Sequence, residues 1–216
     1  SSPDDFCNRK QEQDELLRHA RNGAKVVLFS PRRYGKSSLM TVVQKQLAKE
    51  GFATVYADLF PIASKVDLVA RLTSAFFKEL GKGVDPRSFL QKAKNLFGII
   101  RPTLSMTAEG VNLSADIDPR AKTSLLLDDL MHGVGDYVKK NKTKVSVVLD
   151  EFQEVTELPE AKEIEGILRS HIQFHRSISY FFVGSRRRVL QDMFTMKHRP
   201  FYKSAFLYPL GKISRE

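Results

Sequence analysis

The sequence predicts an α/β domain built on a mainly parallel, five-stranded sheet flanked by helices. Apolar segments of strand length alternate along the chain with amphipathic segments of helical spacing, a pattern typical of a parallel sheet covered by helices. With 216 residues, 42% of them hydrophobic, the chain is long enough to bury one sizeable core. We therefore expect residues 1–216 to form a single core domain.

Each expected element follows from its own pattern. The segment 25–29 is a short apolar run and predicts a buried strand. In the segment after it, apolar residues recur at helical spacing as far as Gly51, a residue typical of helix ends. By the same criteria, the expected strands are 25–29, 52–59, 144–149, 178–183 and 204–210. The expected helices are 11–21, 37–50, 66–80, 88–100, 124–140, 161–174 and 186–196.

The stretch 103–117 differs from its neighbours. Its apolar residues alternate with polar ones on both sides of Glu109-Gly110, which is the pattern of two strands joined by a tight turn. Because this stretch falls between two expected helices, we interpret it as a β-hairpin inserted into the domain and not as part of the central sheet.

Composition limits the setting and the partners. The longest apolar runs are of strand length, far below the roughly 18 residues of a membrane-spanning helix, so we expect no membrane span. The single cysteine, Cys7, excludes an internal disulfide and a multi-cysteine zinc site, and a reducing, cytoplasmic setting fits best. The net charge is +10, and the stretch 186–216 alone holds eight basic and two acidic residues. That balance permits anionic partners such as nucleic acid or nucleotides.

The strongest chemical signal is the segment 30–37, which reads Ser-Pro-Arg-Arg-Tyr-Gly-Lys-Ser between an apolar strand and an amphipathic helix. It matches the phosphate-binding loop G-x-x-x-x-G-K-[ST], except that Ser30 replaces the first glycine. In such a loop, backbone N–H groups surround phosphate at a helix N-terminus, Lys36 reaches the β- and γ-phosphates, and the Ser37 hydroxyl binds Mg²⁺. The alternative is a basic turn. The expected nucleotide-binding residues here are Pro31, Arg32, Arg33, Tyr34, Gly35, Lys36, Ser37 and Ser38.

Two carboxylates follow the expected strand 144–149. Asp150 would hold Mg²⁺, directly or through water, and Glu151 would activate the attacking water as general base. A buried strand that ends in carboxylates is the partner that a phosphate loop needs. The alternative is a solvated acidic turn, but the loop upstream favours the metal-binding interpretation.

Two further polar residues end expected strands. Ser185 follows 178–183, and its hydroxyl would lie beside the carboxylates if the two strands are neighbours. It would then join Lys36 and Glu151 as a catalytic residue; the alternative is an ordinary turn serine. Asp58 ends the second strand and either faces the same site or caps the segment that follows.

Four segments of the chain resemble motifs of one known family. The segment 28–39 is similar to G-P-R-R-x-G-K-[ST]-S-L, and 150–153 to D-E-F-Q. Residues 183–193 are similar to h-G-S-x-x-x-x-x-x-x-M, and 199–202 to the start of P-F-Y-G-R-A. These are motifs of the archaeal-type ATPase family in the STAND branch of the AAA+ proteins. The resemblance covers nearly the whole chain, to about residue 210.

The resemblance implies a P-loop NTPase domain that binds ATP or ADP with Mg²⁺ and hydrolyses ATP slowly, as a regulatory switch. It also implies two roles outside the phosphate loop. Phe6 and Arg9 belong to a segment similar to h-h-G-R-x-x-E, which packs beside the adenine in such ATPases. Ser185 stands where AAA+ proteins carry a polar residue that senses the γ-phosphate.

The chain departs from the family pattern at three places. Ser30 replaces the first loop glycine, an exchange that could tighten or distort the turn. Ser204 stands at the position of the family arginine; Arg199 or Lys203 could supply charge nearby, or a protein partner or second copy of the chain would supply an arginine. The family usually continues into a helical lid and a winged helix, which we expect to be absent from a chain that ends at residue 216.

Two other classes of function stay open. A DNA-binding module related to AAA+ replication initiators, with ATP as a structural ligand, would explain the basic charge. A P-loop kinase would need an acceptor site that the sequence does not show. The run Arg186-Arg187-Arg188 could contact phosphate or a neighbouring subunit, or form a solvated helix face. His171 and His175 have a metal-binding spacing without a recognisable third ligand, so we expect no metal there.

Overall fold

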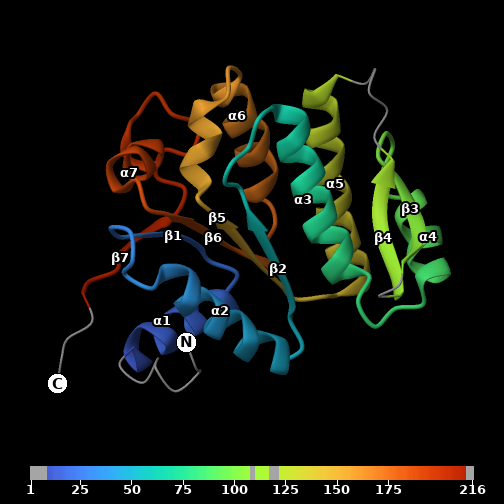
Figure 1. Cartoon of the computed structure of the whole chain (residues 1–216), viewed down its shortest axis with the longest axis horizontal. Helices are drawn as coiled ribbons and strands as arrows, with labels where there is room; N and C mark the ends of the chain where they lie inside the picture. The colour runs from blue at the N-terminus through green and yellow to red at the C-terminus, as the bar shows by residue number, and fades with distance from the viewer. Residues whose placement is uncertain (1–8, 108–109, 117–121, 213–216) are drawn as a thin grey trace.

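The central sheet is parallel throughout. The computed structural model describes residues 9–107, 110–116 and 122–212. Five strands form the sheet in the order β2-β5-β6-β1-β7 (Figure 1), and each pairs with its neighbours in parallel, which confirms the predicted architecture. The strands are β1 (Lys25–Phe29), β2 (Ala53–Asp58), β5 (Val145–Asp150), β6 (Ile178–Gly184) and β7 (Phe206–Pro209).

Helices cover both faces of this sheet. They are α1 (Lys10–Arg21), α2 (Lys36–Lys49), α3 (Lys65–Leu80), α4 (Pro86–Lys94), α5 (Thr123–Asn141), α6 (Ala161–Ile172) and α7 (Arg187–Thr195). In Figure 1, α1 and α2 lie below the sheet, and α3, α5 and α6 lie above it. Successive side chains of a strand point to opposite faces. Accordingly, Val26 and Leu28 join the core formed with α1 and α2, whereas Val27 and Phe29 join the core of the other face.

The helix expected at 88–100 ends earlier than predicted. The structure has α4 at Pro86–Lys94, begun by a proline at the first helical position and by the Asp85 side chain, which accepts the Ser88 N–H at 2.8 Å. Further along, the N–H groups of residues 98, 99 and 100 donate to the Asp129 carboxylate of α5 at 2.7–2.9 Å. Because a side chain from a distant helix binds these donors, the chain turns toward β3 instead of continuing the helix.

The predicted hairpin is confirmed as a separate two-stranded sheet. β3 (Arg101–Thr107) pairs antiparallel with β4 (Gly110–Asp116), and neither strand joins the central sheet. The hairpin begins two residues earlier than the predicted stretch 103–117, whose last residue and turn residues 108–109 lie outside the described part of the chain. In Figure 1, it stands beside α4, at the β2 side of the molecule and away from β7.

The chain leaves β5 through a 3-10 helix, η2 (Phe152–Glu157), which the sequence pattern did not predict. Its first residue, Phe152, is fully buried and packs on an aromatic cluster. The Phe152 ring lies 4.7 Å from the ring centroid of Phe182 on β6 and 5.6 Å from that of Phe201. This packing ties the segment after the β5 carboxylates to the adjacent strand.

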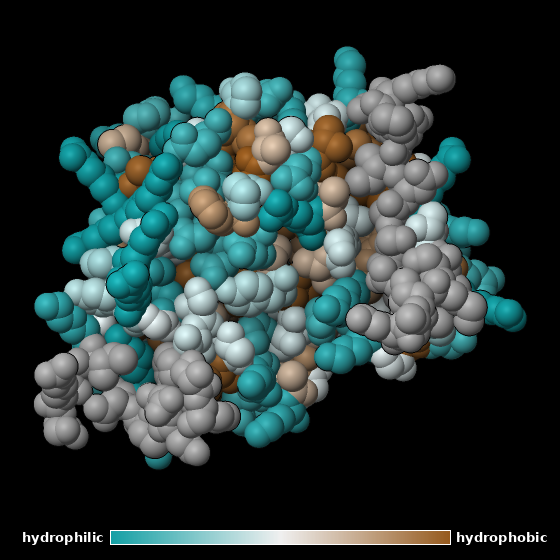
Figure 2. Space-filling view, viewed as in Figure 1, coloured by the Kyte–Doolittle hydropathy of each residue, from teal (hydrophilic) through white to brown (hydrophobic). Residues whose placement is uncertain are grey.

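The face of the molecule shown in Figure 2 is mostly hydrophilic, with hydrophobic residues in small separate areas. Over the described residues, no helix has the length and apolar character needed to cross a membrane.

A cavity of about 590 Å³ lies at the amino end of β6, opposite the edge of the sheet where the strands end. His132, His171 and His175 line it. The His175 Nδ1 atom is 2.7 Å from the Tyr180 hydroxyl, and the His171 Nε2 atom is 2.7 Å from an Asp128 carboxylate oxygen. No group of three or more His, Cys, Asp or Glu side chains able to hold a metal ion occurs in the part of the chain that the structure describes.

Replacing His175 with Gln is expected to remove part of the acid sensitivity of the fold. Burial, reinforced by His171 and Lys25, lowers the pKa of His175 to about 4, so folding favours its neutral form. The unfolded chain binds a proton near pH 6.5, and stability from this residue therefore falls as the pH drops from 7 toward 4.

Urea unfolding at pH 7 and pH 5 checks this. Between these pH values, the wild type should lose about 2 kcal/mol of unfolding free energy relative to His175→Gln. The comparison with the variant isolates His175 from other titrating groups. Parallel pH dependence in the two proteins would contradict the prediction.

Candidate functional site

The carboxyl ends of the parallel strands meet along one edge of the sheet, and a cleft of about 510 Å³ opens there. The loop between β1 and α2 forms one wall, and the ends of β2, β5 and β6 form the others. The residues that line it are Arg32, Arg33, Gly35, Lys36, Ser37, Ser38, Asp58, Phe60, Asp150, Glu151 and Ser185. This cleft therefore collects most of the site residues that the sequence predicts.

The loop between β1 and α2 contains two residues with positive φ. Gly35 precedes α2 with φ 76° and Arg33 has φ 66°, so two of its residues are left-handed. Arg33 adopts this region without being glycine, at a cost of order 1–3 kcal/mol. Ser30 is buried but is not among the described residues with positive φ, so the shape of this loop does not require glycine there. Pro31 on the loop and Ser38 in the first turn of α2 are exposed, and Tyr34 is half-buried.

Lys36 is folded into the loop. Its Nζ atom donates to the backbone carbonyl oxygens of Ser30 at 3.0 Å and Pro31 at 3.1 Å. Burial lowers the pKa of Lys36, and the carboxylates of Glu151 and Asp150 partly offset that effect. A buried ammonium group beside the N-terminus of α2 favours an anionic ligand in the cleft.

Two oxygen ligands suitable for Mg²⁺ lie together. The Ser37 hydroxyl donates to an Asp150 carboxylate oxygen at 2.8 Å, which joins the start of α2 to the end of β5. Hydroxyl, carboxylate and water oxygens are what Mg²⁺ prefers, and it usually takes few protein ligands and completes its shell with phosphate and water. The pair therefore fits the predicted metal site, although one carboxylate is too few to hold the ion without phosphate.

Tyr56 on β2 is a site residue that sequence reasoning missed. Its hydroxyl donates to the same Asp150 oxygen that accepts from Ser37. Burial and the neighbouring carboxylate raise the pKa of Tyr56, so the phenol stays protonated as a donor. Its distance from Asp150 in the sequence concealed the contact, because only the pairing of β2 with β5 brings the two together.

The structure places Glu151 and Ser185 side by side, because β5 and β6 are neighbours. The Ser185 hydroxyl donates to Glu151 Oε2 at 2.9 Å, and the Ser185 backbone N–H approaches the same oxygen at 3.3 Å. Glu151 itself has φ 52°, a left-handed conformation that turns the chain sharply after β5. Positive φ in a residue without a glycine's freedom is a feature that concentrates at functional sites.

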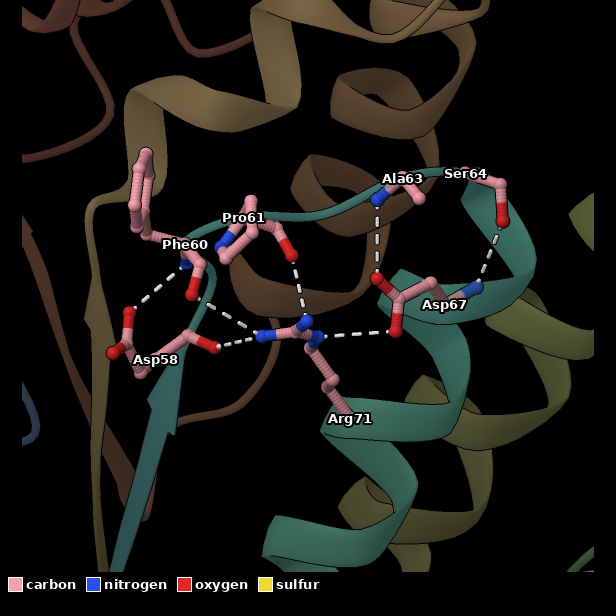
Figure 3. Close-up of polar contacts among 7 residues, drawn as sticks. All are labelled: Asp58, Phe60, Pro61, Ala63, Ser64, Asp67 and Arg71. Atoms are coloured by element: carbon pink, nitrogen blue, oxygen red, sulfur yellow. Dashed lines mark hydrogen bonds and ion pairs between the residues drawn. The ribbon is translucent and has the colours of Figure 1, made fainter.

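Figure 3 shows the hydrogen bonds that fix the segment between β2 and α3, at the edge of the cleft. The guanidinium of Arg71 donates to the backbone oxygens of Asp58 and Phe60, and to that of Pro61 at 2.6 Å, and it pairs with Asp67 at 3.0 Å. The Asp58 carboxylate accepts the Phe60 N–H at 2.9 Å and also lines the cleft, so both alternatives considered for it occur together. These hydrogen bonds from Arg71 and Asp58 fix the segment that carries Phe60, whose side chain is 54% exposed and lines the cleft.

Arg9 is buried against the loop between β1 and α2. It is 1% exposed, and its guanidinium pairs with Glu12 at 2.8 Å while donating to the backbone oxygens of Tyr34 at 3.2 Å and Gly211 at 2.8 Å. These contacts tie the start of α1 to the loop and to the segment after β7. Phe6, the other residue expected near adenine, lies outside the described residues.

Two candidate charges do not reach the cleft. Lys203 lies near Lys25, which opens β1 at the far end of the sheet, and Arg199 pairs with the buried Glu165 of α6. The expectation that either supplies charge to this chain's own site is wrong, because the segment between α7 and β7 returns to the amino ends of the strands. In the arginine run, Arg186 pairs with Glu157 and Arg187 lies 5.6 Å above the Phe29 ring.

Comparisons with known proteins find likeness in structure alone. No family model and no curated protein matches the chain. Among solved structures, the chain is similar to the ORC2 protein of Aeropyrum pernix, determined as ADPNP–ADP complexes, with 18% identity and a TM-score of 0.57. The match covers 95% of this chain and 48% of that one.

Two more archaeal structures have the same architecture. The ORC1 protein of Aeropyrum pernix, in complex with DNA, matches with 13% identity and a TM-score of 0.55, over 94% of this chain and 45% of that one. Cdc6p from Pyrobaculum aerophilum matches with 15% identity and a TM-score of 0.53, over 96% and 47%. The chain spans about half the length of these structures, and at such low identity the likeness establishes the fold. That fold is an α/β fold with a parallel five-stranded sheet.

Proposed function

We propose that this domain binds ATP and ADP with Mg²⁺, hydrolyses ATP slowly and acts as a nucleotide-controlled regulatory switch of the STAND type. One observation carries the proposal: a single cleft holds the loop with Lys36, the oxygen pair Ser37 and Asp150, and the carboxylate Glu151. We take residues 1–216 as the core domain of that switch, and the single cysteine supports a reducing, cytoplasmic setting.

Each residue has a distinct task in this proposal. The loop N–H groups and Lys36 bind the phosphates, while Ser37 and Asp150 offer oxygens to the metal. Mg²⁺, when bound, would neutralise charge on the β- and γ-phosphates. Glu151 would accept a proton from the water that attacks the γ-phosphorus as the bond to the β-phosphate oxygen breaks, and Ser185 would donate to a γ-phosphate oxygen.

We expect slow turnover because the cleft has no arginine, among the described residues, from outside its own loop. Within the described residues, the cleft holds Arg32 and Arg33, both on the loop itself, and Arg199 is engaged by Glu165. An arginine that stabilises the transition-state charge raises the rate of such reactions by about 10³–10⁵-fold. We therefore propose that a protein partner or a second copy of the chain supplies one and accelerates hydrolysis.

Replacing Lys36 with Ala is expected to weaken Mg·ATP binding by about 10- to 100-fold and to abolish measurable hydrolysis. The charge-assisted bonds from a buried ammonium to phosphate contribute about 1.5–3 kcal/mol, and the variant loses them. Calorimetric titration and phosphate release would measure the two effects. Lys45→Ala, an exposed change on the same helix, is the matched control. Wild-type protein that binds no nucleotide, or a Lys36→Ala variant with unchanged affinity, would overturn the proposal.

DNA binding is the second candidate, favoured by the net charge of +10. Arg32 and Arg33 are exposed at the cleft, and no ion pair joins either one to a described residue. One of the structural neighbours was determined in complex with DNA. Affinity for a labelled duplex that falls steeply between 50 and 200 mM salt would support this function, as expected where phosphate contacts dominate. No binding at low salt would exclude it for this domain.

A further inference from the structure

Gln153 is a buried polar residue in η2 to which the proposed mechanism gives no task. Its side chain is 1% exposed. The Nε2 atom donates to Glu151 Oε2, and a longer contact of 3.5 Å reaches Glu154. The Oε1 atom is buried and accepts no hydrogen bond from a described residue. A buried amide acceptor without a partner costs about 1–3 kcal/mol, so this oxygen lowers the stability of the fold.

The donors around Glu151 are distributed unevenly. Gln153 Nε2, the Ser185 hydroxyl and the Ser185 backbone N–H all converge on Oε2. No described residue donates to Oε1. One carboxylate oxygen is thus anchored from two elements, η2 and the end of β6, while the other stays available to accept a proton from water in the cleft.

The absence of a side chain at Gly184 leaves the space that the Gln153 side chain fills. A Cβ atom added at Gly184 would lie far inside contact distance of Gln153 Oε1, and 3.1 Å from the Cδ atom of the same side chain. The φ angle of Gly184 is not in the left-handed region, so close approach and not backbone conformation excludes a side chain there. The glutamine therefore sits wedged between the last residue of β6 and the carboxylate of Glu151.

We propose that Gln153 is a positioning residue that fixes the Glu151 carboxylate for proton abstraction, and that Gly184 provides the space for it. The inference deepens the proposed ATP hydrolysis and rests on it. Loss of the Gln153 donor leaves Oε2 held from the β6 side alone, so the carboxylate can rotate away from the attacking water. A displacement of about 1 Å at a reacting group can cost about 100-fold in rate.

Gln153→Met tests this directly, because it keeps the side-chain volume and removes the donor. We expect kcat for ATP to fall by about 10- to 100-fold while the Kd for Mg·ADP stays within about twofold. Gln173→Met, an exposed change in the chain after α6, is the matched control and should leave both constants unchanged. A folded Gln153→Met variant with wild-type kcat would overturn the proposal.

Gly184 supplies a second, independent test. Gly184→Ala should lower kcat in the same way, because its methyl group displaces the Gln153 amide. In the Gly184→Ala/Gln153→Ala double variant the methyl group no longer meets Gln153, and only its 3.1 Å contact with Leu190 Cδ2 is left, so kcat should lie close to that of Gln153→Ala alone. Two independent effects that multiply in the double variant would contradict the proposed coupling.

A readout without turnover separates this inference from the proposed function. The Ser185 amide N–H bonds to Glu151 Oε2, and its hydrogen exchange reports whether the carboxylate is held. In nucleotide-free Gln153→Met this amide should exchange faster than in the wild type, with protection in α1 unchanged. If the wild type fails to hydrolyse ATP, the proposed function falls, and unchanged Ser185 exchange in the variant would still refute the positioning role.

Discussion

Replacing Glu151 with Gln is expected to lower the rate of ATP hydrolysis by about 10²–10⁴-fold, the range typical for loss of a general base. The amide keeps the size of the side chain but cannot accept the proton from water. Lys36, Ser37 and Asp150 are unchanged, so Mg·ATP affinity should be retained or slightly improved, since a negative charge near the phosphates is removed. Single-turnover hydrolysis and equilibrium binding measure the two constants separately.

The Glu151→Gln result has a close control in Glu160→Gln, an exposed carboxylate beyond η2 that is expected to change neither constant. Two other outcomes would contradict the prediction. Unchanged hydrolysis in Glu151→Gln would show that this carboxylate is not the base. Loss of nucleotide binding would show that Glu151 holds the metal, a task that we propose for Asp150, which accepts a hydrogen bond from Ser37.

The sheet could be predicted because its strands are encoded locally. The apolar run of β1 gave its bounds directly, since the four residues after Lys25 are apolar and buried. The end of α4 could not be predicted, because the Asp129 carboxylate that binds the N–H groups after it comes from α5. The same holds for η2, whose first residue is fixed by packing on Phe182 and Phe201.

The candidate site also contains some residues that a local motif indicates and others that only the assembled sheet brings together. Phosphate loops follow a fixed local spacing, and so the sequence indicated Lys36, Ser37 and the loop around them. Tyr56 and Gln153 were missed because their contacts to the two carboxylates exist only once β2, β5 and β6 are assembled. Ser185 needed the knowledge that β5 and β6 are neighbours, which strand order in the sequence does not give.

Replacing Arg199 with Ala is expected to destabilise the fold by about 3–5 kcal/mol at pH 8, because it leaves a buried carboxylate without its partner. Glu165 is fully buried, and Arg199 is its ion-pair partner. Burial raises the pKa of Glu165 to about 7 even though Arg199 opposes the shift, so removal of Arg199 would raise it further. A group with a raised pKa in the folded state loses its contribution as the pH rises through that value. The loss should therefore be larger at pH 8 than at pH 5, where Glu165 is protonated in the variant.

Chemical denaturation at both pH values tests this, with Arg199→Ala/Glu165→Gln as the matched variant. Without the carboxylate, the double variant should recover much of the stability lost at pH 8. Equal destabilisation at both pH values would show that Arg199 acts by packing and not by charge. Arg199→Ala should also leave Mg·ATP affinity unchanged, because its partner Glu165 lies on α6, outside the residues that line the cleft. A large fall in Mg·ATP affinity would instead show that Arg199 contacts the nucleotide. In that case Arg199 itself could stabilise the transition-state charge, and no arginine from a partner would be needed.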